Sequence, residues 1–108
     1  MAGYLLIASR DPFESGEIRN FYELAKGLSR EGDPVTLALV QNGVLPARDG
    51  SNVHWFDELT AAGVEVVADE FSLRERGIPR TRLVHGVTPV SLDVVIQRLA
   101  EGRKALWQ

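Results

Sequence analysis

The 108-residue sequence contains no cysteine. This absence excludes disulfides, thiolate nucleophiles, persulfide carriers and cysteine-bound iron–sulfur clusters from the chemistry of the chain. The sequence also lacks an excess of basic residues: its net charge is −3, so no positive field points to nucleic acid or to an anionic membrane surface. No apolar run approaches the roughly 20 residues of a membrane span. We therefore expect neither nucleic-acid nor membrane partners.

The composition that is present is ordinary for a soluble globular chain, with 44% apolar and 25% charged residues. Residues 1–108 are predicted to form a single domain, because a chain of this length buries about two-thirds of its unfolded surface. The apolar run that starts at Tyr4 follows no basic region and precedes no cleavage site. We interpret it as a buried strand rather than a signal peptide, and we expect a cytoplasmic location.

Short apolar segments recur along the chain, with polar residues at their ends. They are found at residues 4–9, 35–40, 64–68 and 104–107. Because such segments are short and partly β-branched, they predict strands that are covered on both faces of a sheet. Residues 83–87 are predicted as a further short strand, which Thr88 and Pro89 end.

Helical patterns lie between the predicted strands. Apolar residues recur at the spacing of one helix face over residues 18–28. The start of this helix has two alternatives: Asp11 opens a capping-box pattern with Pro12 at the first helical position, and Ser15 is a competing N-cap one turn later.

Three further helices are predicted, at residues 53–62, 70–76 and 92–100. Asp69 and Ser91 stand at the N-cap positions of the last two. The helix over 53–62 is apolar on two sides, through Trp55 and Phe56, which predicts contact with the sheet and with another subunit. Residues 43–52 hold two glycines and a proline, and we expect a mobile loop with room for one helical turn.

This alternation of strands and helices predicts an α/β fold, a three-layer α/β/α sandwich around a five-stranded parallel sheet. In such sheets, ligands bind beyond the carboxyl ends of the strands. The rule selects Ser9 with Asp11, Asn42 with Gly43, Asp69 and Glu70 with Ser72, and Thr88.

Two phosphate-related functions can be weighed at these positions. The glycine patterns of dinucleotide and P-loop sites are absent, and Asp11, Glu14 and Glu17 would repel a phosphate at the first helix. Asp11 and Asp69 have the order of the acids in a phosphate-accepting receiver domain, but Lys104 lies at the wrong end of the last strand for such a site. We favour helix capping as the role of both aspartates.

Asp11, Asp69 and Glu70 form an alternative acid–base set, because carboxylates that come close together favour general acid–base chemistry. The two histidines, His54 and His85, have no metal-binding spacing, so we expect neither a metal nor a cofactor.

Four arginines fall within nine residues. Charged runs of this kind usually form a solvated surface, so we favour that role over contact with an anion or a partner beside Ser72. The four arginines are Arg74, Arg76, Arg80 and Arg82.

The order of several short motifs resembles the DsrE/DsrF-like (YchN-like) family over nearly the whole chain. These motifs are residues 9–15 before the first helix, Ala62 to Val67, Leu73 to Ile78, Gly86 to Val94, and the final segment Lys104 to Leu106.

The resemblance implies a five-stranded parallel sheet and an oligomer, either a homo-oligomer (trimer or hexamer) or a hetero-oligomer with other DsrE-like subunits. It also implies a place in sulfur relay, in which members carry a persulfide on a cysteine that precedes a Leu-x-x-Arg-Gly stretch. In this sequence Ser72 holds that position. A hydroxyl forms no persulfide and is a poor nucleophile without a base.

We therefore expect a non-catalytic, oligomeric binding or scaffold subunit, in which the family resemblance points to one binding site. Its candidate residues are Ser9, Asp11, Asn42, Gly43 and Ser72, bordered by Arg74 and Arg76. Two alternatives remain, both acting on an anionic small molecule: a small acid–base enzyme, or a carrier that binds its ligand non-covalently.

Overall fold

The computed structural model describes residues 3–51 and 54–108, in which five strands form one sheet of order β4-β3-β2-β1-β5. The strands are β1 (Tyr4–Ala8), β2 (Val35–Leu39), β3 (Glu65–Asp69), β4 (Val87–Val90) and β5 (Lys104–Trp107). All four pairings between these strands are parallel, which confirms the predicted sheet.

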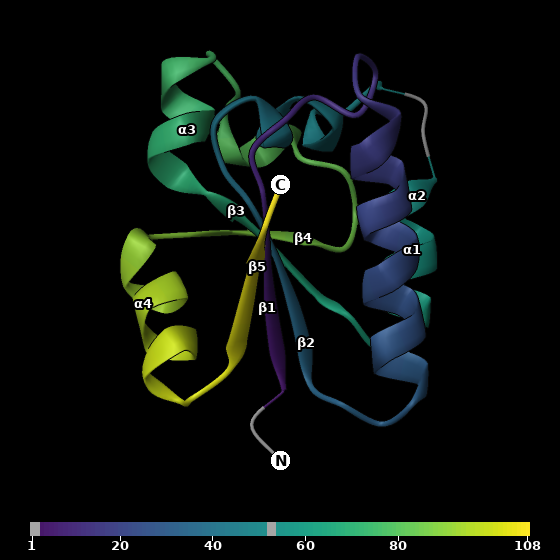
Figure 1. The fold of residues 1–108 in the computed structure, drawn as a ribbon. Helices are drawn as coiled ribbons and strands as arrows, with labels where there is room; N and C mark the ends of the chain where they lie inside the picture. Colours follow the sequence, from purple (N-terminus) through teal and green to yellow (C-terminus); the bar gives the residue numbers. More distant parts are fainter. Residues whose placement is uncertain (1–2, 52–53) are drawn as a thin grey trace.

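The helices lie on both faces of the sheet (Figure 1). Helices α1 (Gly16–Arg30) and α2 (Trp55–Ala61) cover one face, and α4 (Leu92–Ala100) lies against the other. Helix α3 (Glu70–Glu75) follows β3 directly, next to the 3₁₀ helix η1 (Gln41–Ala47) that follows β2. A second short 3₁₀ helix, η2, spans Arg80–Arg82. The predicted three-layer α/β/α sandwich is confirmed.

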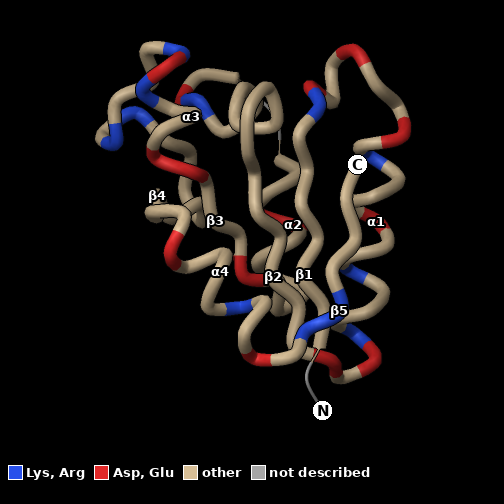
Figure 2. The backbone as a smooth tube through the Cα atoms, turned by 60° about the vertical axis from the view of Figure 1, so that its left-hand side comes forward, with Lys and Arg blue, Asp and Glu red and all other residues tan. Residues whose placement is uncertain are grey.

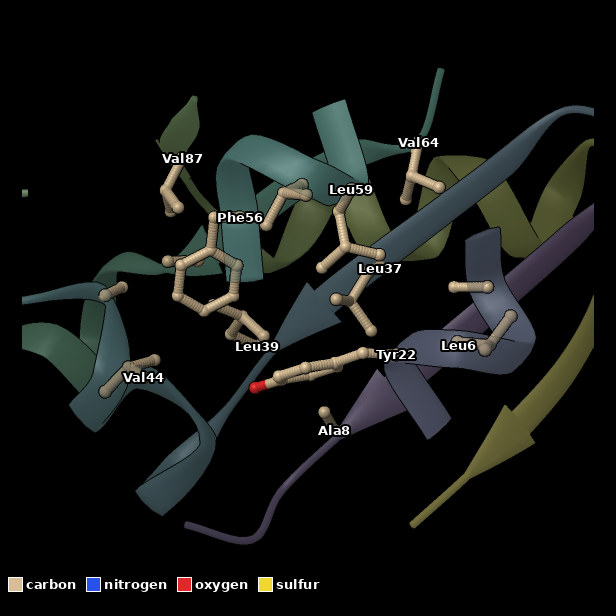
Figure 3. Packing of buried hydrophobic residues seen from close by; sticks show 14 of the residues in the cluster. Leu6, Ala8, Tyr22, Leu37, Leu39, Val44, Phe56, Leu59, Val64 and Val87 are labelled. Atoms are coloured by element: carbon tan, nitrogen blue, oxygen red, sulfur yellow. The ribbon is translucent and has the colours of Figure 1, made fainter. Parts of the chain in front are cut away.

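The larger hydrophobic core lies between the sheet and helices α1 and α2 (Figure 3). Strand residues such as Leu37 alternate sides, and those on this face pack against Tyr22 of α1 and Phe56 and Leu59 of α2. Phe56 is only 2% exposed. The prediction that it helps to bury a subunit contact is therefore wrong, because its side of α2 faces this core.

The opposite face of the sheet has a thinner cover. Its buried cluster comprises Leu5, Ile7, Ala38 and Val67 from the strands, with Val95 from α4. Val95 is the one buried residue of α4. The other apolar side chains of this helix therefore stay in contact with solvent.

Helix α1 begins after Ser15, at the later of the two predicted positions. Asp11 does not start the helix: its Oδ1 accepts the backbone N–H of Phe13 at 3.0 Å, within a turn that precedes the helix. The side chain of Ser15 makes no capping hydrogen bond to the described residues, and neither does that of Ser91 before α4.

The fourth strand is a correction to the sequence prediction, which placed it at residues 83–87 and ended it at Thr88-Pro89. Strand β4 instead starts at Val87 and includes Pro89, which stands in register with Ala68 of β3. Proline is tolerated here because β4 is an edge strand, whose outer side needs no N–H donor. Leu83 forms an isolated antiparallel bridge with Arg48 instead.

The segment predicted as a loop at 43–52 is helical in its first half. Four residues of η1 are buried, including Val44 and Ala47, so this part packs against the core. Asn52 and Val53, at the end of the predicted loop and the start of the predicted helix 53–62, lie outside the described residues, and α2 begins at Trp55.

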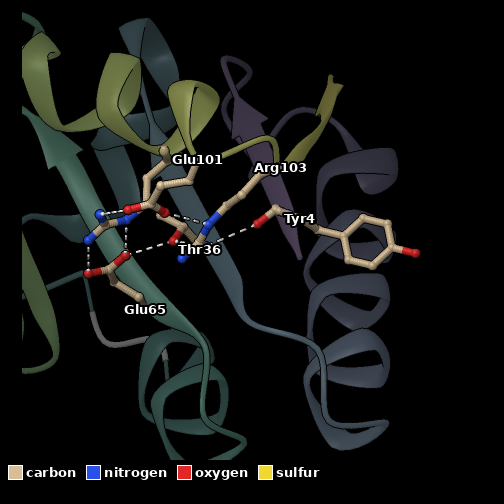
Figure 4. A network of polar contacts seen from close by, with 6 residues as sticks. Tyr4, Thr36, Glu65, Glu101 and Arg103 are labelled. Carbon is tan, nitrogen blue, oxygen red and sulfur yellow. Dashed lines mark hydrogen bonds and ion pairs between the residues drawn. The ribbon is translucent and has the colours of Figure 1, made fainter. Parts of the chain in front are cut away.

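A polar network at the amino-terminal ends of the strands fastens α4 to the sheet (Figure 4). Arg98 of α4 donates to both oxygens of Glu65 at 3.0 Å, and Glu65 accepts the hydroxyl of Thr36 at 2.6 Å. Arg103 completes the network by donating to Thr36 at 2.7 Å, and it also pairs with Glu101. The hydrogen bond from Arg98 holds the pKa of Glu65 below its usual value, against the effect of its partial burial.

None of the helices in the described part of the chain has the length and apolar character needed to cross a bilayer.

Candidate functional site

Ser72 lies at the carboxyl end of the sheet, in the first turn of α3. Asp69 ends β3 and caps this helix, since its Oδ2 accepts the Ser72 N–H at 3.0 Å. The Ser72 hydroxyl donates to the same Oδ2 at 2.7 Å and accepts the N–H of Gln41 at 2.8 Å. Gln41 has a φ of +51°, a left-handed conformation uncommon outside glycine. The predicted cap is confirmed, and the buried hydroxyl joins α3 to the start of η1.

Arg76 and Asn42 join this group. The Arg76 Nε donates to Oδ1 of Asn42 at 3.1 Å, and its Nη1 donates to the Ser72 carbonyl at 3.2 Å. The structure therefore brings Asn42, Ser72 and Arg76 together, as the sequence predicted. The same contacts commit much of the guanidinium to internal hydrogen bonds, so fewer of its donors remain for an anion.

Ser9 and Gly43 lie on neighbouring strand ends. The Ser9 hydroxyl donates to the Gln108 carbonyl at 2.8 Å and accepts the indole N–H of Trp107 at 3.1 Å. Gly43 is buried against Ala8, and a Cβ at this position would overlap the Ala8 carbonyl oxygen. Both residues thus hold the end of β1 in place, and neither presents an uncommitted polar side chain.

Asp11 and Arg74 lie apart from the Ser72 group. Asp11 caps its own turn, and its charge acts on Tyr22 of the α1 face, whose pKa is raised mainly by burial and further by this carboxylate. The Tyr22 hydroxyl is buried and has no hydrogen-bond partner in the described structure. Arg74 is exposed. The other two arginines of the sequence cluster pair with carboxylates that do not line the groove described below, Arg80 with Glu70 at 3.1 Å and Arg82 with Asp49 at 3.6 Å.

An apolar groove of about 570 Å³ opens beside Ser72, between the carboxyl end of the sheet and α4. Large apolar side chains on its walls are exposed: Trp107 by 66%, Phe71 by 60% and Leu92 by 58%. The apolar lining consists of Ile7, Val40, Phe71, Leu92, Val95, Ile96, Leu99 and Trp107. Its polar part consists of Gln41, Asp69, Ser72, Glu75 and Arg76.

The charges of this rim do not converge on a single anion site. Figure 2 shows arginines gathered about α3 and acidic residues on the segment that leads into α1, on the other side of the rim. Within the groove, two carboxylates, Asp69 and Glu75, accompany the single guanidinium of Arg76. The polar end of the groove therefore offers acceptors as well as donors.

The remaining candidate residues lie elsewhere. His54 stands before α2 and faces Asp57 at 3.7 Å, and His85 lies in the turn before β4 rather than in a strand. No cluster of three or more potential metal ligands occurs among residues 3–51 and 54–108. Lys104 pairs with Tyr4 at the amino-terminal end of the sheet, which agrees with the argument against a receiver-type site.

The model of the DsrE/DsrF-like family matches residues 2–107 of the chain. The chain belongs to this family. The resemblance drawn from the short motifs is thereby confirmed, and the chain is a DsrE/DsrF-like protein without cysteine. A search of curated proteins finds no significant match.

Solved structures share the fold at low sequence identity. The ychN protein from E. coli has a TM-score of 0.85 and 22% identity, over 98% of this chain and 99% of that chain. The MTH1491 protein from Methanobacterium thermoautotrophicum, of unknown function, has a TM-score of 0.76 and 24% identity, over 97% and 99%. The BT1422 protein from Bacteroides thetaiotaomicron, also of unknown function, has 0.75 and 18%, over 97% and 94%. At these identities the similarity establishes the fold alone.

The apolar side of this DsrE-like site is not among the residues that the sequence patterns predict. The apolar stripe of α4, which contains Leu92, Ile96 and Leu99, predicts a helix but does not by itself predict that these side chains line a groove. Trp107 of β5 also lines the groove. One signal in the sequence points to this groove. Helix α4 has only nine residues yet carries a stripe of large apolar side chains, more than a thin layer of strand side chains can cover, so part of the stripe stays exposed.

Proposed function

We propose that this chain is a non-catalytic DsrE-like protein that acts as an oligomeric binding or scaffold subunit. The proposed assembly is a homo-oligomer (a trimer or a hexamer) or a hetero-oligomer with other DsrE-like subunits. The family relation suggests a cytoplasmic setting in sulfur relay or sulfur metabolism. The observation that carries this proposal is the exposed apolar groove beside a fully hydrogen-bonded Ser72.

The contacts of Ser72 argue against nucleophilic chemistry at this position. Its hydroxyl proton is directed to Asp69, and its oxygen accepts the Gln41 N–H. The residue is only 4% exposed. A serine nucleophile needs an adjacent base and access to the substrate. Here the neighbouring carboxylate already serves as a helix cap, so the group suits the support of a surface better than catalysis.

The groove supports a binding role. Exposed apolar side chains that adjoin one another on a small protein indicate a contact surface for a protein or a ligand. Ile96 is 54% exposed and Leu99 is 44% exposed, and both line the same groove as Trp107. Aromatic residues are enriched at the centres of protein interfaces, where they contribute much of the affinity. We therefore assign the groove and its rim to subunit contact.

Light scattering coupled to gel filtration tests this proposal. At micromolar concentration, a scaffold subunit is expected to have the mass of an oligomer, either alone or after mixing with DsrE-like subunits from the same host. A chain that stays monomeric in both experiments would refute the scaffold role.

A non-covalent carrier is the second candidate, because the groove has the volume of a small-molecule site and carries polar groups at one end. Thermal-shift measurements with small anions distinguish the two functions. A ligand at 100 times its dissociation constant adds about 2.7 kcal/mol of stability. Stabilisation of this size, in a chain that stays monomeric, favours the carrier.

The acid–base enzyme has less support. Asp11 and Asp69 each accept an N–H from their own turn, and Glu70 pairs with Arg80. Of these three carboxylates, Asp69 alone lines the groove. Carboxylates engaged in this way do not form the closely spaced pair that general acid–base catalysis uses.

A further inference from the structure

The two edges of the sheet differ in their capacity to pair with another strand. An edge strand presents backbone N–H and C=O groups that a strand of another chain can join. Strand β4 forms one edge and contains Pro89, which has no N–H to donate. Strand β5 forms the other edge, and its sequence, Lys-Ala-Leu-Trp, has no proline. The β5 edge is therefore the one suited to strand addition.

The hydrogen bonds of β5 identify which of its backbone groups face outward. Lys104 N–H donates to the Gly3 carbonyl and Gln108 N–H donates to the Ile7 carbonyl, so these residues face β1. In a parallel ladder, residues alternate between the two sides of a strand. Ala105 and Trp107 therefore direct their N–H and C=O groups away from the sheet.

This edge is open in the described structure. In Figure 1, β5 lies in front of the other strands, between α1 and α4, and no drawn segment crosses it. The side chains of Ala105 and Trp107 are exposed. Apolar side chains stand on both sides of the strand: Leu24 of α1 lines a hollow with Gln108, and Leu99 of α4 lines the groove with Trp107.

We propose that a second copy of this chain pairs with β5 in antiparallel fashion, about a two-fold axis at Leu106. This axis places Ala105 opposite Trp107 of the second copy, and each such pair exchanges both of its outward N–H···O bonds. The two five-stranded sheets then form one continuous sheet. The inference rests on the proposed oligomeric function and names one surface that mediates it, a two-fold contact that a hexamer of two trimers contains and a trimer lacks.

The side chains suit this register. Ala105 stands beside Leu5, and Trp107 beside Ile7, so both lie on the α4 face of the sheet. The small alanine leaves room for the indole of the second copy. Lys104 faces Gln108 of the second copy, so no like charges oppose each other. A two-fold contact is self-complementary, and the same few residues serve on both subunits.

The apolar area is also of the required size. Trp107, Leu99, Ile96 and Leu92 are each between 44% and 66% exposed and adjoin the strand or its groove. Together with Leu24 they present on the order of 500 Å² of apolar surface, at the upper end of what a monomer leaves exposed. A stable dimer buries about 800 Å² on each subunit, of which such a patch forms the apolar centre.

The test compares the same substitution on the two edges. Ala105→Glu places a carboxylate against the indole of the second copy, whereas Thr88→Glu makes a matched change at an exposed position of the β4 edge. Sedimentation or light scattering over a dilution series is expected to show a dissociation constant raised at least roughly tenfold by Ala105→Glu and unchanged by Thr88→Glu. Circular dichroism melting checks that both variants fold.

Hydrogen exchange on the unmodified chain gives a second measurement, which does not depend on a variant. The N–H groups of Ala105 and Trp107 are expected to lose protection on dilution, while that of Leu106, which faces β1, keeps it. An oligomer that is insensitive to Ala105→Glu and leaves these N–H groups unprotected would overturn the β5 interface and spare the scaffold proposal. A strict monomer would overturn both.

Discussion

Replacing Ser72 with alanine tests whether its hydroxyl is a structural link. The hydroxyl joins three segments: it accepts the N–H of Gln41 at the start of η1, donates to Asp69 at the end of β3, and belongs to α3. Alanine keeps the backbone N–H that Asp69 accepts but removes the acceptor for Gln41. A donor left unpaired away from water costs about 1–3 kcal/mol, and the lost bond to the carboxylate costs about 1.5–3 kcal/mol.

Relaxation of the backbone at Gln41 offsets part of this loss of stability. Gln41 holds a left-handed φ of +51°, which costs a non-glycine residue about 1 kcal/mol or more. Once its N–H is released, the residue is free to leave that conformation. We therefore expect Ser72→Ala to lower the free energy of unfolding by about 2 kcal/mol, in the range typical of breaking a buried hydrogen-bond network.

Urea unfolding followed by circular dichroism measures this change. For a domain of this size, with an m-value of about 1–2 kcal/mol/M, the midpoint is expected to fall by about 1–2 M. Ser29→Ala is the matched control: its hydroxyl donates to the Ala62 carbonyl at 2.8 Å and leaves no N–H donor unpaired when removed. Alanine also favours the helix at position 29, so we expect a loss below about 1 kcal/mol. Equal stability of Ser72→Ala and the unmodified chain would refute the structural role.

Two further predictions concern the opposite rim and the end of β1. The pKa of Glu65 is depressed by Arg98, so its contribution to stability is complete above the unfolded pKa of about 4.3 and is lost as the pH falls through the folded value. Melting curves from pH 7 to pH 3 are expected to show a smaller acid loss for Glu65→Gln, and an unchanged acid loss would contradict the assignment. Gly43→Ala forces a Cβ onto the Ala8 carbonyl and is expected to cost about 2 kcal/mol or more in urea unfolding, whereas Gly27→Ala, in open space on α1, is expected to stabilise the chain.

The elements with strong periodicity or strong termination signals were predictable from the sequence. The strands β1, β2, β3 and β5 are short apolar segments between polar residues, and α1 shows a full helical stripe. Asp69 could be recognised as the cap of α3 because an aspartate after an apolar strand is a common N-cap. These features depend on neighbours within a few residues, so the sequence carries them directly.

The position predicted for the fourth strand, residues 83–87, is wrong because it relied on local sequence signals. Pro89 normally ends a strand, yet at a sheet edge its missing N–H leaves no pairing group unsatisfied. The edge position follows from the order of all five strands, which no local pattern reveals. The burial of Phe56 could not be predicted for a similar reason. Both sides of α2 are apolar, and only the packing of the whole chain decides which side contacts the core.

The candidate site was predictable in part. The carboxyl-end rule correctly placed Asn42 and Ser72 at one rim, since residues that follow neighbouring parallel strands meet there, and Arg76, which the family resemblance added at its border, contacts both. The rule could not separate Asp11, whose carboxylate turns to its own backbone. The sequence also does not reveal that Arg76 donates hydrogen bonds to Asn42 and to the Ser72 carbonyl. Hydrogen bonds between residues far apart in the chain form only in the folded state.

Sequence alone determined the family, the parallel α/β layers and the absence of thiol chemistry, because motif order, periodicity and composition are properties of the chain itself. The tertiary structure alone decided that α4 buries only Val95, that an apolar groove stays open beside Ser72, and that β5 offers an unprotected edge. Burial and edge exposure depend on how much of each surface the other elements cover, and that quantity exists only once the whole chain has packed.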